Sequence, residues 1–190
     1  MSRPLRVTAV SGSYKLPSRT AALVEALTQQ LGQHIPIELH SIELSEIGSS
    51  LVSSFDPKQL PAKVQKDIEA IETADLLIVA TPVYRASYTG LFKHLFDLVN
   101  YEALIDVPVL LAATGGSERH ALIIDHELRP LFSFFQALTL PIGVYATEGD
   151  FENYKVKSET VKARIELAIE RALPLLTHRE LVKAASLQAV

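Results

Sequence analysis

Short apolar segments alternate with amphipathic segments along most of the chain. The apolar segments read as nearly continuous hydrophobic runs, which is typical of strands buried on both faces of a parallel sheet. In the amphipathic segments leucines recur one helical turn apart, as at Leu23, Leu27 and Leu31. The pattern predicts strands at 5–10, 35–41, 75–81, 107–114 and 140–146. It predicts helices at 18–31, 61–73, 89–99, 118–138 and 156–177, with a long connection over 42–60.

This order of elements predicts an α/β protein with a parallel sheet and helices on both faces. Five strands fit the flavodoxin-like order 2-1-3-4-5 better than the six-stranded dinucleotide-binding order. We expect one domain over 1–178 and a C-terminal tail over 179–190. In such folds ligands bind beyond the carboxyl ends of the strands, near the point where the strand order reverses. The loops after the first, third and fourth strands are therefore interpreted together.

Composition narrows the class of protein. The 190 residues are 48% hydrophobic and 21% charged, as in an ordinary globular domain. A net charge of −4 argues against nucleic-acid binding. The absence of cysteine excludes disulfides and thiolate chemistry, and no spacing of His, Asp or Glu suggests a metal site. Neither a signal peptide nor a membrane-spanning run is evident, so we expect a cytoplasmic protein.

The first loop has the chemistry of an anion site. It leads from a strand into a helix N-terminus, which has free N–H groups and a partial positive charge. Ser13, Ser18 and Thr20 add hydroxyl groups, and Lys15 or Arg19 can add positive charge. Neither a GxGxxG nor a Walker lysine pattern is present, so a single terminal phosphate is favoured over a pyrophosphate. The alternative is an ordinary turn followed by a capped helix.

The second and third loops suit a planar heterocycle. Pro82 ends a strand, and Tyr84 and Tyr88 offer flat surfaces, although both tyrosines could equally pack in the core or at an interface. In the third loop Gly115 and Gly116 allow a close approach of backbone N–H groups to a ligand, or form a plain turn. Each loop is a weak signal alone, but all three lie where this fold binds its ligand.

The sequence resembles the NAD(P)H-dependent FMN reductases of the flavodoxin-like superfamily over nearly its whole length. The resemblance is carried by GSYKLPSRTAAL (12–23), LLIVATPVYRASYTGLFKHLFDLV (76–99) and ATGGSERHALIIDHELRPL (113–131). The middle motif is the most specific, because TPVY followed by Y-x-G-x-x-K is characteristic of the group. The sequence is similar in particular to the reductase components of alkanesulfonate and methanesulfonate two-component monooxygenases.

The resemblance implies FMN as flavin, NADH or NADPH as reductant, and a flavin-dependent sulfonate monooxygenase as partner. It implies a homo-oligomer, a dimer or a tetramer, to which the apolar stretch around Phe132, Phe134 and Phe135 could contribute. No residue is assigned a catalytic role, although Arg85 is a candidate for electrostatic help. The implied flavin-binding residues are Ser11, Ser13, Ser18, Arg19, Thr20, Pro82, Val83, Tyr84, Arg85, Thr114, Gly115, Gly116, Ser117 and His120. Related sequences often have Pro-Arg where this chain has Tyr14-Lys15, which leaves a phosphate contact by Lys15 open.

The predicted helix over 118–138 contains Pro130, which cannot donate to the carbonyl of His126 four residues earlier. Breaks of this kind often hold π-bulges at functional sites. The resemblance places His126 at an inserted position, where sulfonate-linked reductases form a π-helix at an oligomer interface that favours flavin exchange. The alternative is a simple proline kink with a solvent-facing histidine.

Other functions remain open at this point. A flavin-retaining quinone, azo or chromate reductase would share the same motifs. A flavodoxin-type electron carrier is a different class, which the mild net charge and the absence of tryptophan disfavour. Nothing supports a non-catalytic nucleotide-binding regulator.

Overall fold

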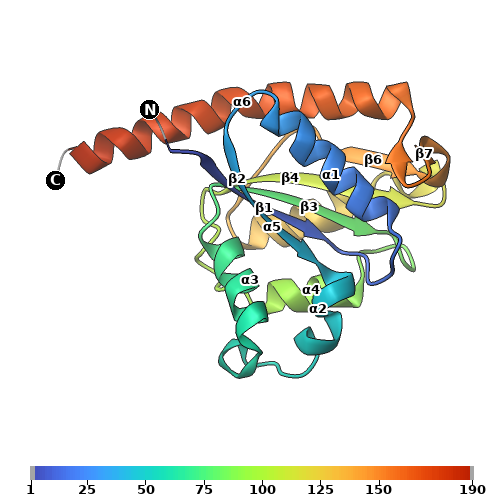
Figure 1. The fold of residues 1–190 in the computed structure, drawn as a ribbon, viewed down its shortest axis with the longest axis horizontal. Helices are drawn as coiled ribbons and strands as arrows, with labels where there is room; N and C mark the ends of the chain where they lie inside the picture. The colour runs from blue at the N-terminus through green and yellow to red at the C-terminus, as the bar shows by residue number, and fades with distance from the viewer. Residues whose placement is uncertain (1–2, 189–190) are drawn as a thin grey trace.

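The computed structural model describes the backbone of residues 3–188 and the side chains of residues 3–177. A parallel sheet lies between two layers of helices, as the ribbon in Figure 1 shows. The strand order is β2-β1-β3-β4-β5, with β6 also paired to β4, which confirms the predicted flavodoxin-like fold class. The strands of this sheet are β1 (Leu5–Ser11), β2 (Ile37–Glu43), β3 (Leu76–Pro82), β4 (Pro108–Gly115), β5 (Leu138–Thr139) and β6 (Val144–Thr147).

The fifth position of the sheet holds two short strands, so the single strand predicted at 140–146 is wrong in its extent. β5 pairs with the start of β4 and β6 with its end. Pro141, in the gap between them, has no N–H to contribute to a ladder. Two arginines bind carbonyls there: Arg129 Nη1 donates to Leu140 O at 3.1 Å, and Arg164 Nε donates to Gly143 O at 2.9 Å. Side chains thus replace the missing backbone partners.

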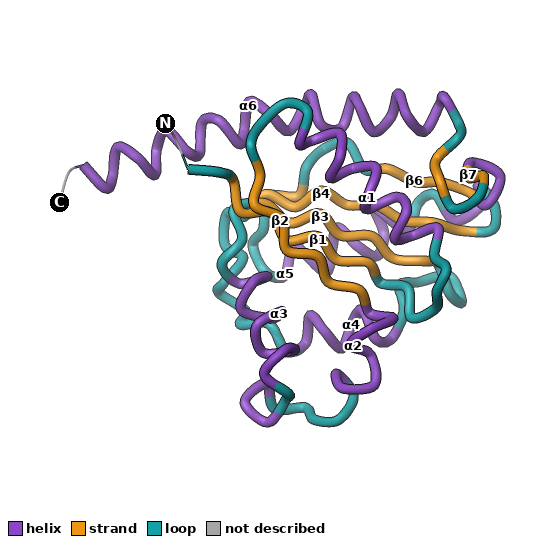
Figure 2. Tube along the Cα trace, viewed as in Figure 1, coloured by secondary structure: helices purple, strands orange, loops and turns teal. Residues whose placement is uncertain are grey.

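Helices cover both faces of the sheet (Figure 2). One face carries α1 (Arg19–Gly32) and α6 (Glu159–Gln188), and the other carries α2 (Leu44–Leu51), α3 (Ala62–Glu72), α4 (Gly90–Asp97) and α5 (Arg129–Phe134). The long connection predicted over 42–60 is wrong, because it contains α2 and a 3-10 turn at Pro57–Gln59. Leu44, Ile47 and Leu51 form the buried face of α2, a pattern too short to stand out among its serines.

The segment predicted as one helix over 118–138 is in fact three. A 3-10 turn at Glu118–His120 precedes a π-helix at Ile124–Leu128, which continues into α5. The helix ends at Phe134, because Gln136 adopts a left-handed conformation (φ 55°) and Leu138 already belongs to β5. Pro130 is the second residue of α5, directly after the π-helix, so its missing N–H falls where the helix changes its hydrogen-bonding pattern.

The core has one part on each side of the sheet. Leu77 and Val79 pack toward α2–α5, while their neighbours Leu76 and Ile78 pack toward α1 and α6. Phe92, Phe96 and Phe132 form an aromatic chain with ring centroids 4.9 Å apart at each step. Of the apolar stretch considered for oligomerisation, Phe132 and Phe135 belong to this core and Phe134 is exposed.

The C-terminal part of the chain differs from its prediction in two places. A short hairpin, β7 (Phe151–Glu152) and β8 (Lys155–Val156), precedes α6, which therefore begins at Glu159 and not at residue 156. The backbone of α6 continues through most of the expected tail over 179–190, and residues 189–190 lie outside the described part. Among the described residues, no helix combines the length and the apolar character needed to cross a membrane.

Candidate functional site

A cleft of about 420 Å³ opens at the carboxyl edge of the sheet, where the loops after β1, β3 and β4 meet. Its lining contains ten of the residues implied by the sequence: Ser13, Ser18, Arg19, Thr20, Pro82, Val83, Tyr84, Thr114, Gly115 and Gly116. Lys15, Pro17 and Glu148 complete the lining. Ser11, Arg85, Ser117 and His120 lie outside it.

The first loop presents the N-terminus of α1 to the cleft. Ser18 is the N-cap: its Oγ accepts from the N–H of Ala21 at 3.2 Å, and its carbonyl accepts from Ala22 at 3.1 Å. The N–H groups of Arg19 and Thr20 precede these bonded donors, in the turn where a helix has no internal acceptors. The Ser18 hydroxyl hydrogen is also free to donate, because the cap uses only the oxygen as acceptor.

Gly12 brings this loop against the third strand. A Cβ at this position would lie 2.9 Å from Phe92 Cδ2 and 3.0 Å from the carbonyl oxygen of Ala80, so only glycine fits. The Gly12 N–H donates to that carbonyl at 2.7 Å. Thr89, the N-cap of α4, donates its hydroxyl to Gly12 O at 3.1 Å. The loop after β1 is therefore held to β3 by a backbone hydrogen bond and to the loop after β3 by the Thr89 hydroxyl.

A buried pair of hydroxyls joins the first and third loops. Thr20 Oγ1 and Thr114 Oγ1 are 2.7 Å apart, and both side chains are buried. The second and third loops are joined by the N–H of Val83, which donates to Thr114 O at 2.8 Å. Thr114 thus contacts both neighbouring loops and fixes the floor of the cleft.

The second loop contains a tight turn. Tyr84 and Ser87 exchange both backbone hydrogen bonds, and Arg85 (φ 52°) and Ala86 (φ 71°) are both left-handed. Such turns normally carry glycine or asparagine, so this conformation is strained and must be held by its surroundings. The turn directs Tyr84 into the cleft lining and leaves Arg85 exposed at its tip, outside the lining. An electrostatic role for Arg85 stays a prediction.

Tyr84 packs edge-on against Tyr14, with ring centroids 5.4 Å apart. Burial raises the pKa of Tyr84, and the neighbouring Tyr14 raises it further. The Tyr84 phenol is therefore neutral at physiological pH and acts as a hydrogen-bonding group rather than an anion. An uncharged tyrosine beside the cleft adds no repulsion toward an anionic ligand.

The third loop uses its two glycines differently. A Cβ at Gly115 would lie 2.1 Å from the Tyr145 hydroxyl oxygen, which donates to Ser117 O at 2.7 Å. Gly116 has open space around it and is exposed at the cleft. Neither glycine has a positive φ. Gly115 therefore makes room for a side chain of the protein itself, and Gly116 leaves the backbone accessible. His120 closes the following 3-10 turn, partly exposed.

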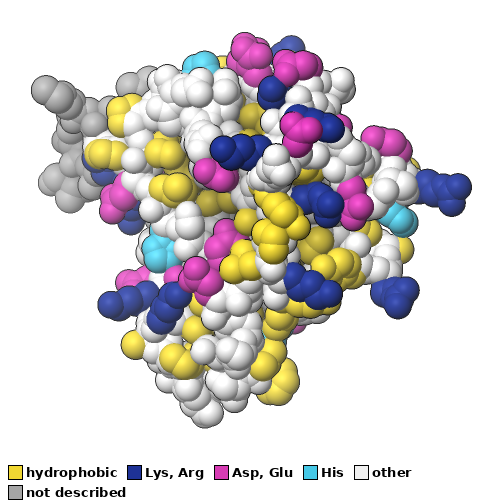
Figure 3. Space-filling model, turned by 45° about the vertical axis from the view of Figure 1, so that its right-hand side comes forward, with side chains coloured by type: hydrophobic (Ala, Val, Ile, Leu, Met, Phe, Trp, Pro, Cys, Tyr) yellow, Lys and Arg dark blue, Asp and Glu magenta, His cyan; other side chains and the backbone are white. Residues whose placement is uncertain are grey.

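The cleft contains opposite charges, because Lys15, Arg19 and Glu148 all belong to its lining. Figure 3 shows Lys, Arg, Asp and Glu side chains mixed on the face that it turns forward. Arg19 Nη1 lies 3.4 Å from Glu148 Oε1, and its guanidinium lies over the Tyr154 ring at 5.8 Å. Lys15 lies 5.9 Å from the centre of the Tyr14 ring. Sequence reasoning missed Glu148, although it directly follows β6 at the carboxyl edge of the sheet.

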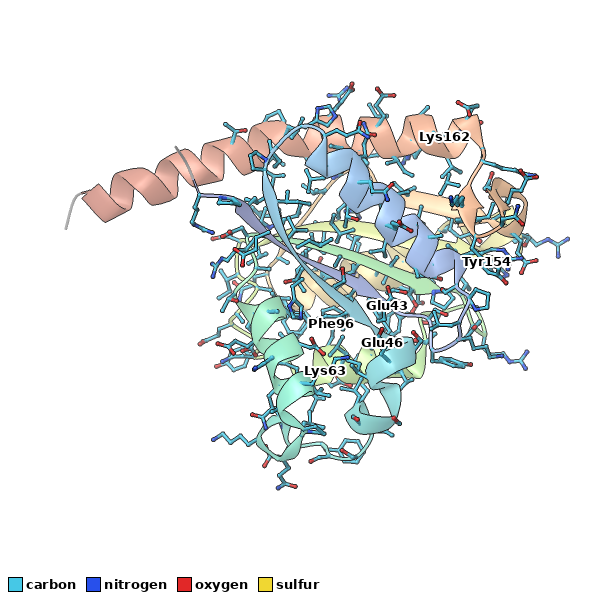
Figure 4. The ribbon with its side chains drawn as sticks, in the orientation of Figure 1. Glu43, Glu46, Lys63, Phe96, Tyr154 and Lys162 are labelled. Atoms are coloured by element: carbon cyan, nitrogen blue, oxygen red, sulfur yellow. The ribbon has the colours of Figure 1, made fainter. Side chains whose placement is uncertain are left out.

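Ser11 lies below the cleft at the end of β1, where it pairs in register with Glu43 of β2. Ser11 Oγ and Glu43 Oε2 are buried without a hydrogen-bond partner among the described residues. Burial raises the pKa of Glu43, and the charge of Glu46 adds to this rise. Figure 4 shows Glu43 at the end of β2, with Glu46 following on α2. Ser11 thus belongs to the support of the first loop.

His126 lies inside the π-helix at Ile124–Leu128 and is exposed. Its neighbour Glu127 accepts a hydrogen bond from Ser87 Oγ at 2.9 Å, which ties the π-helix to the strained turn of the second loop. The π-helix is therefore in contact with the cleft region through Glu127.

Comparisons with known proteins agree with this geometry. The chain is 62% identical to the NADH-dependent FMN reductase SfnF of Pseudomonas fluorescens and 60% identical to an FMN reductase (NADPH) of Pseudomonas aeruginosa, covering 97% of this chain and all of each relative. Its structure is similar to an apo NADH:FMN oxidoreductase (EmoB), with a TM-score of 0.78 and 31% identity over 86% of each chain. The family model described as NADPH-dependent FMN reductase matches residues 5–152. The chain belongs to the NADPH-dependent FMN reductase family.

Proposed function

We propose that this protein is an NAD(P)H-dependent FMN reductase that supplies reduced FMN to a flavin-dependent alkanesulfonate or methanesulfonate monooxygenase. Family membership and the names of the relatives support the reductase activity. The sulfonate monooxygenase is inferred from the resemblance of the three motifs to the reductase components of such systems. The observation that carries the proposal is that the N-terminus of α1, with its free N–H groups and the Ser18 hydroxyl, lines the same cleft as the accessible backbone of Gly116.

The residues of the cleft fit FMN. The first loop and the start of α1 carry hydroxyl groups, helix N–H groups and two cations, Lys15 and Arg19. This set of donors matches a monoester phosphate. Pro82, Val83 and Tyr84 offer an apolar and aromatic wall for the ring system. Gly116 leaves room for a ligand to approach the backbone. Of the implied residues outside the lining, Arg85, Ser117 and His120 are part of the proposal as residues around the cleft, and Ser11, which is fully buried, as a support of the first loop.

When FMN is bound, its ring system supplies the hydride-accepting chemistry, and the protein supplies binding and orientation. The first loop holds the phosphate end, which fixes the position of the ring along the edge of the sheet. The turn at Tyr84–Ser87 borders the ring, and the N–H groups around Gly116 can stabilise negative charge that develops there. No protein nucleophile or metal is needed for these roles.

A reductase that delivers reduced FMN must hold its flavin moderately. A site that binds mainly through the phosphate and the backbone, with one face open, meets this need, because nicotinamide and flavin can enter in turn. We assign both NADH and NADPH as candidate reductants, since the relatives at 62% and 60% identity carry names that differ on this point.

One set of assays tests the function against its alternatives. The purified protein is examined for bound flavin, and oxidation of NADH and NADPH is followed with and without added FMN. A colourless protein with FMN-dependent turnover supports the proposal. A firmly bound flavin with turnover only on quinones, azo dyes or chromate supports the flavin-retaining alternative. Binding of FMN without oxidation of either nucleotide supports the electron carrier.

We further propose that the protein is cytoplasmic, with one domain over 1–178 followed by a C-terminal extension, and that it forms a homodimer or homotetramer. The π-helix and its exposed His126 are proposed to favour flavin exchange at the oligomer interface. Substitution His126→Ala should then give tighter retention and slower release of FMN. Unchanged FMN affinity and turnover would refute this role of His126. Light scattering coupled to size-exclusion chromatography measures the oligomeric state.

A further inference from the structure

Glu148 places a negative charge inside a cleft whose other charged groups are positive. It lines the cleft together with Lys15 and Arg19 and stands on the 3-10 turn Glu148–Asp150 that follows β6. Thr147 and Asp150 form a capping box at this turn, with Asp150 Oδ2 accepting from the Thr147 N–H at 2.7 Å and from its hydroxyl at 2.8 Å. The backbone that carries Glu148 is therefore fixed by contacts that do not involve its own carboxylate.

The carboxylate of Glu148 is directed at Arg19. The two groups are 3.4 Å apart, and the Arg19 guanidinium also lies over the ring of Tyr154 at 5.8 Å. Figure 4 shows Tyr154 beside the N-terminal end of α1, where Arg19 is the first helical residue. Arg19 is thus held between Glu148 and Tyr154, two residues of the segment that follows β6.

From this arrangement we infer that Glu148 is an affinity-limiting residue, which competes with the phosphate group of FMN for Arg19. A phosphate that enters the first loop must draw the Arg19 guanidinium away from Glu148. Otherwise it binds while the Arg19 charge is still partly neutralised by Glu148. Either course lowers the affinity for a phosphate-bearing flavin and leaves a flavin without phosphate unaffected. The inference rests on the proposed function and adds to it a reason for moderate FMN retention.

The size of the change in FMN affinity depends on how exposed the Arg19 and Glu148 side chains are. The Arg19 and Glu148 side chains are 41% and 64% exposed, so their interaction is screened by water and salt. Pairs of this kind change a binding constant by about two- to fivefold. The effect should shrink as ionic strength rises, because exposed charges are screened within a Debye length of about 10 Å at 0.1 M salt.

The test compares FMN with riboflavin, which differs only in lacking the phosphate. Equilibrium dialysis at low ionic strength measures the dissociation constants of both flavins for the wild type, Glu148→Gln and a control variant. The control is Glu159→Gln, because Glu159 is also an exposed carboxylate paired with a cation, Lys162, and does not line the cleft. Circular dichroism and thermal unfolding verify that each variant is folded.

We expect Glu148→Gln to bind FMN about two- to fivefold more tightly, with riboflavin unchanged and Glu159→Gln like the wild type. In an Arg19→Gln background the gain from Glu148→Gln should disappear, because the competition acts through Arg19. Unchanged or weaker FMN binding by Glu148→Gln would overturn the inference, as would an equal gain for riboflavin or a gain that persists without Arg19. If the wild type itself binds FMN no better than riboflavin, the proposed phosphate site fails, and the inference fails with it.

Discussion

Substitution Gly115→Ala tests how the third loop is built. The added Cβ would lie 2.1 Å from the Tyr145 hydroxyl oxygen and 3.1 Å from Cζ of the same ring. Since a carbon and an oxygen do not approach closer than about 3 Å without a bond, the ring must move by about 1 Å. The movement breaks the hydrogen bond from Tyr145 Oη to Ser117 O, which is 2.7 Å long.

The loss of stability in Gly115→Ala has two parts. Forcing extra volume into a packed site costs about 1–3 kcal/mol, and loss of the hydrogen bond costs about 0.5–1.5 kcal/mol. We therefore expect Gly115→Ala to lower the free energy of unfolding by about 1.5–4.5 kcal/mol. Gly116→Ala is the matched control, because no heavy atom lies within 4 Å of its added Cβ. Its effect should stay within about 0.5 kcal/mol.

Urea denaturation of Gly115→Ala, Tyr145→Phe and the double variant measures the clash itself. Removing the hydroxyl removes the closest atom, so the double variant should be less destabilised than the sum of the single variants, by about 1 kcal/mol or more. Equal destabilisation by Gly115→Ala and Gly116→Ala would show that Tyr145 does not limit the space at Gly115. Strict additivity in the double variant would show the same.

Two further changes probe the support of the cleft. Because the folded pKa of Glu43 lies above its ordinary value of 4.5, the folded state binds this proton more tightly, and its ionisation destabilises the fold as pH rises above 4.5. Glu43→Gln should therefore gain stability relative to the wild type between pH 4.5 and pH 8 in urea titrations; a stability difference that is constant with pH would contradict this. Thr89→Ala removes the cap of α4 and the bond to Gly12 O, and should cost about 1–3 kcal/mol by thermal unfolding. Thr89→Ser keeps both bonds and should cost less than half as much, so equal losses would count against the role of the hydroxyl.

The layered fold could be predicted because its strands are buried on both faces. Leu76–Pro82 is an uninterrupted buried strand, and such a run has few other interpretations. The helix α2 could not be found in the same way, because eight residues with one buried face carry too little periodic signal. The division of the fifth strand leaves carbonyls that Arg129 and Arg164 bind from 11 and 21 residues away, and such contacts do not appear in the local pattern.

The cleft, like the fold, could be predicted from the sequence only in part. The first loop follows from local chemistry, since a serine before a helical pattern indicates an N-cap, and Ser18 is one. The reason for Gly115 lies in Tyr145, 30 residues away in the sequence, so the local pattern suggested a ligand where a tyrosine hydroxyl is the close neighbour. The pairing of Arg19 with Glu148 is likewise a tertiary contact that spacing does not indicate.

In the proposed complex the end of α1 holds the phosphate of FMN at the carboxyl edge of the sheet. A crystal structure of the protein with FMN tests it most directly. We predict that the phosphate lies within hydrogen-bond distance of residues 13–20 and that the ring lies beside residues 82–85 and 114–117. Electron density for FMN elsewhere on the protein, with residues 13–20 empty, would contradict it.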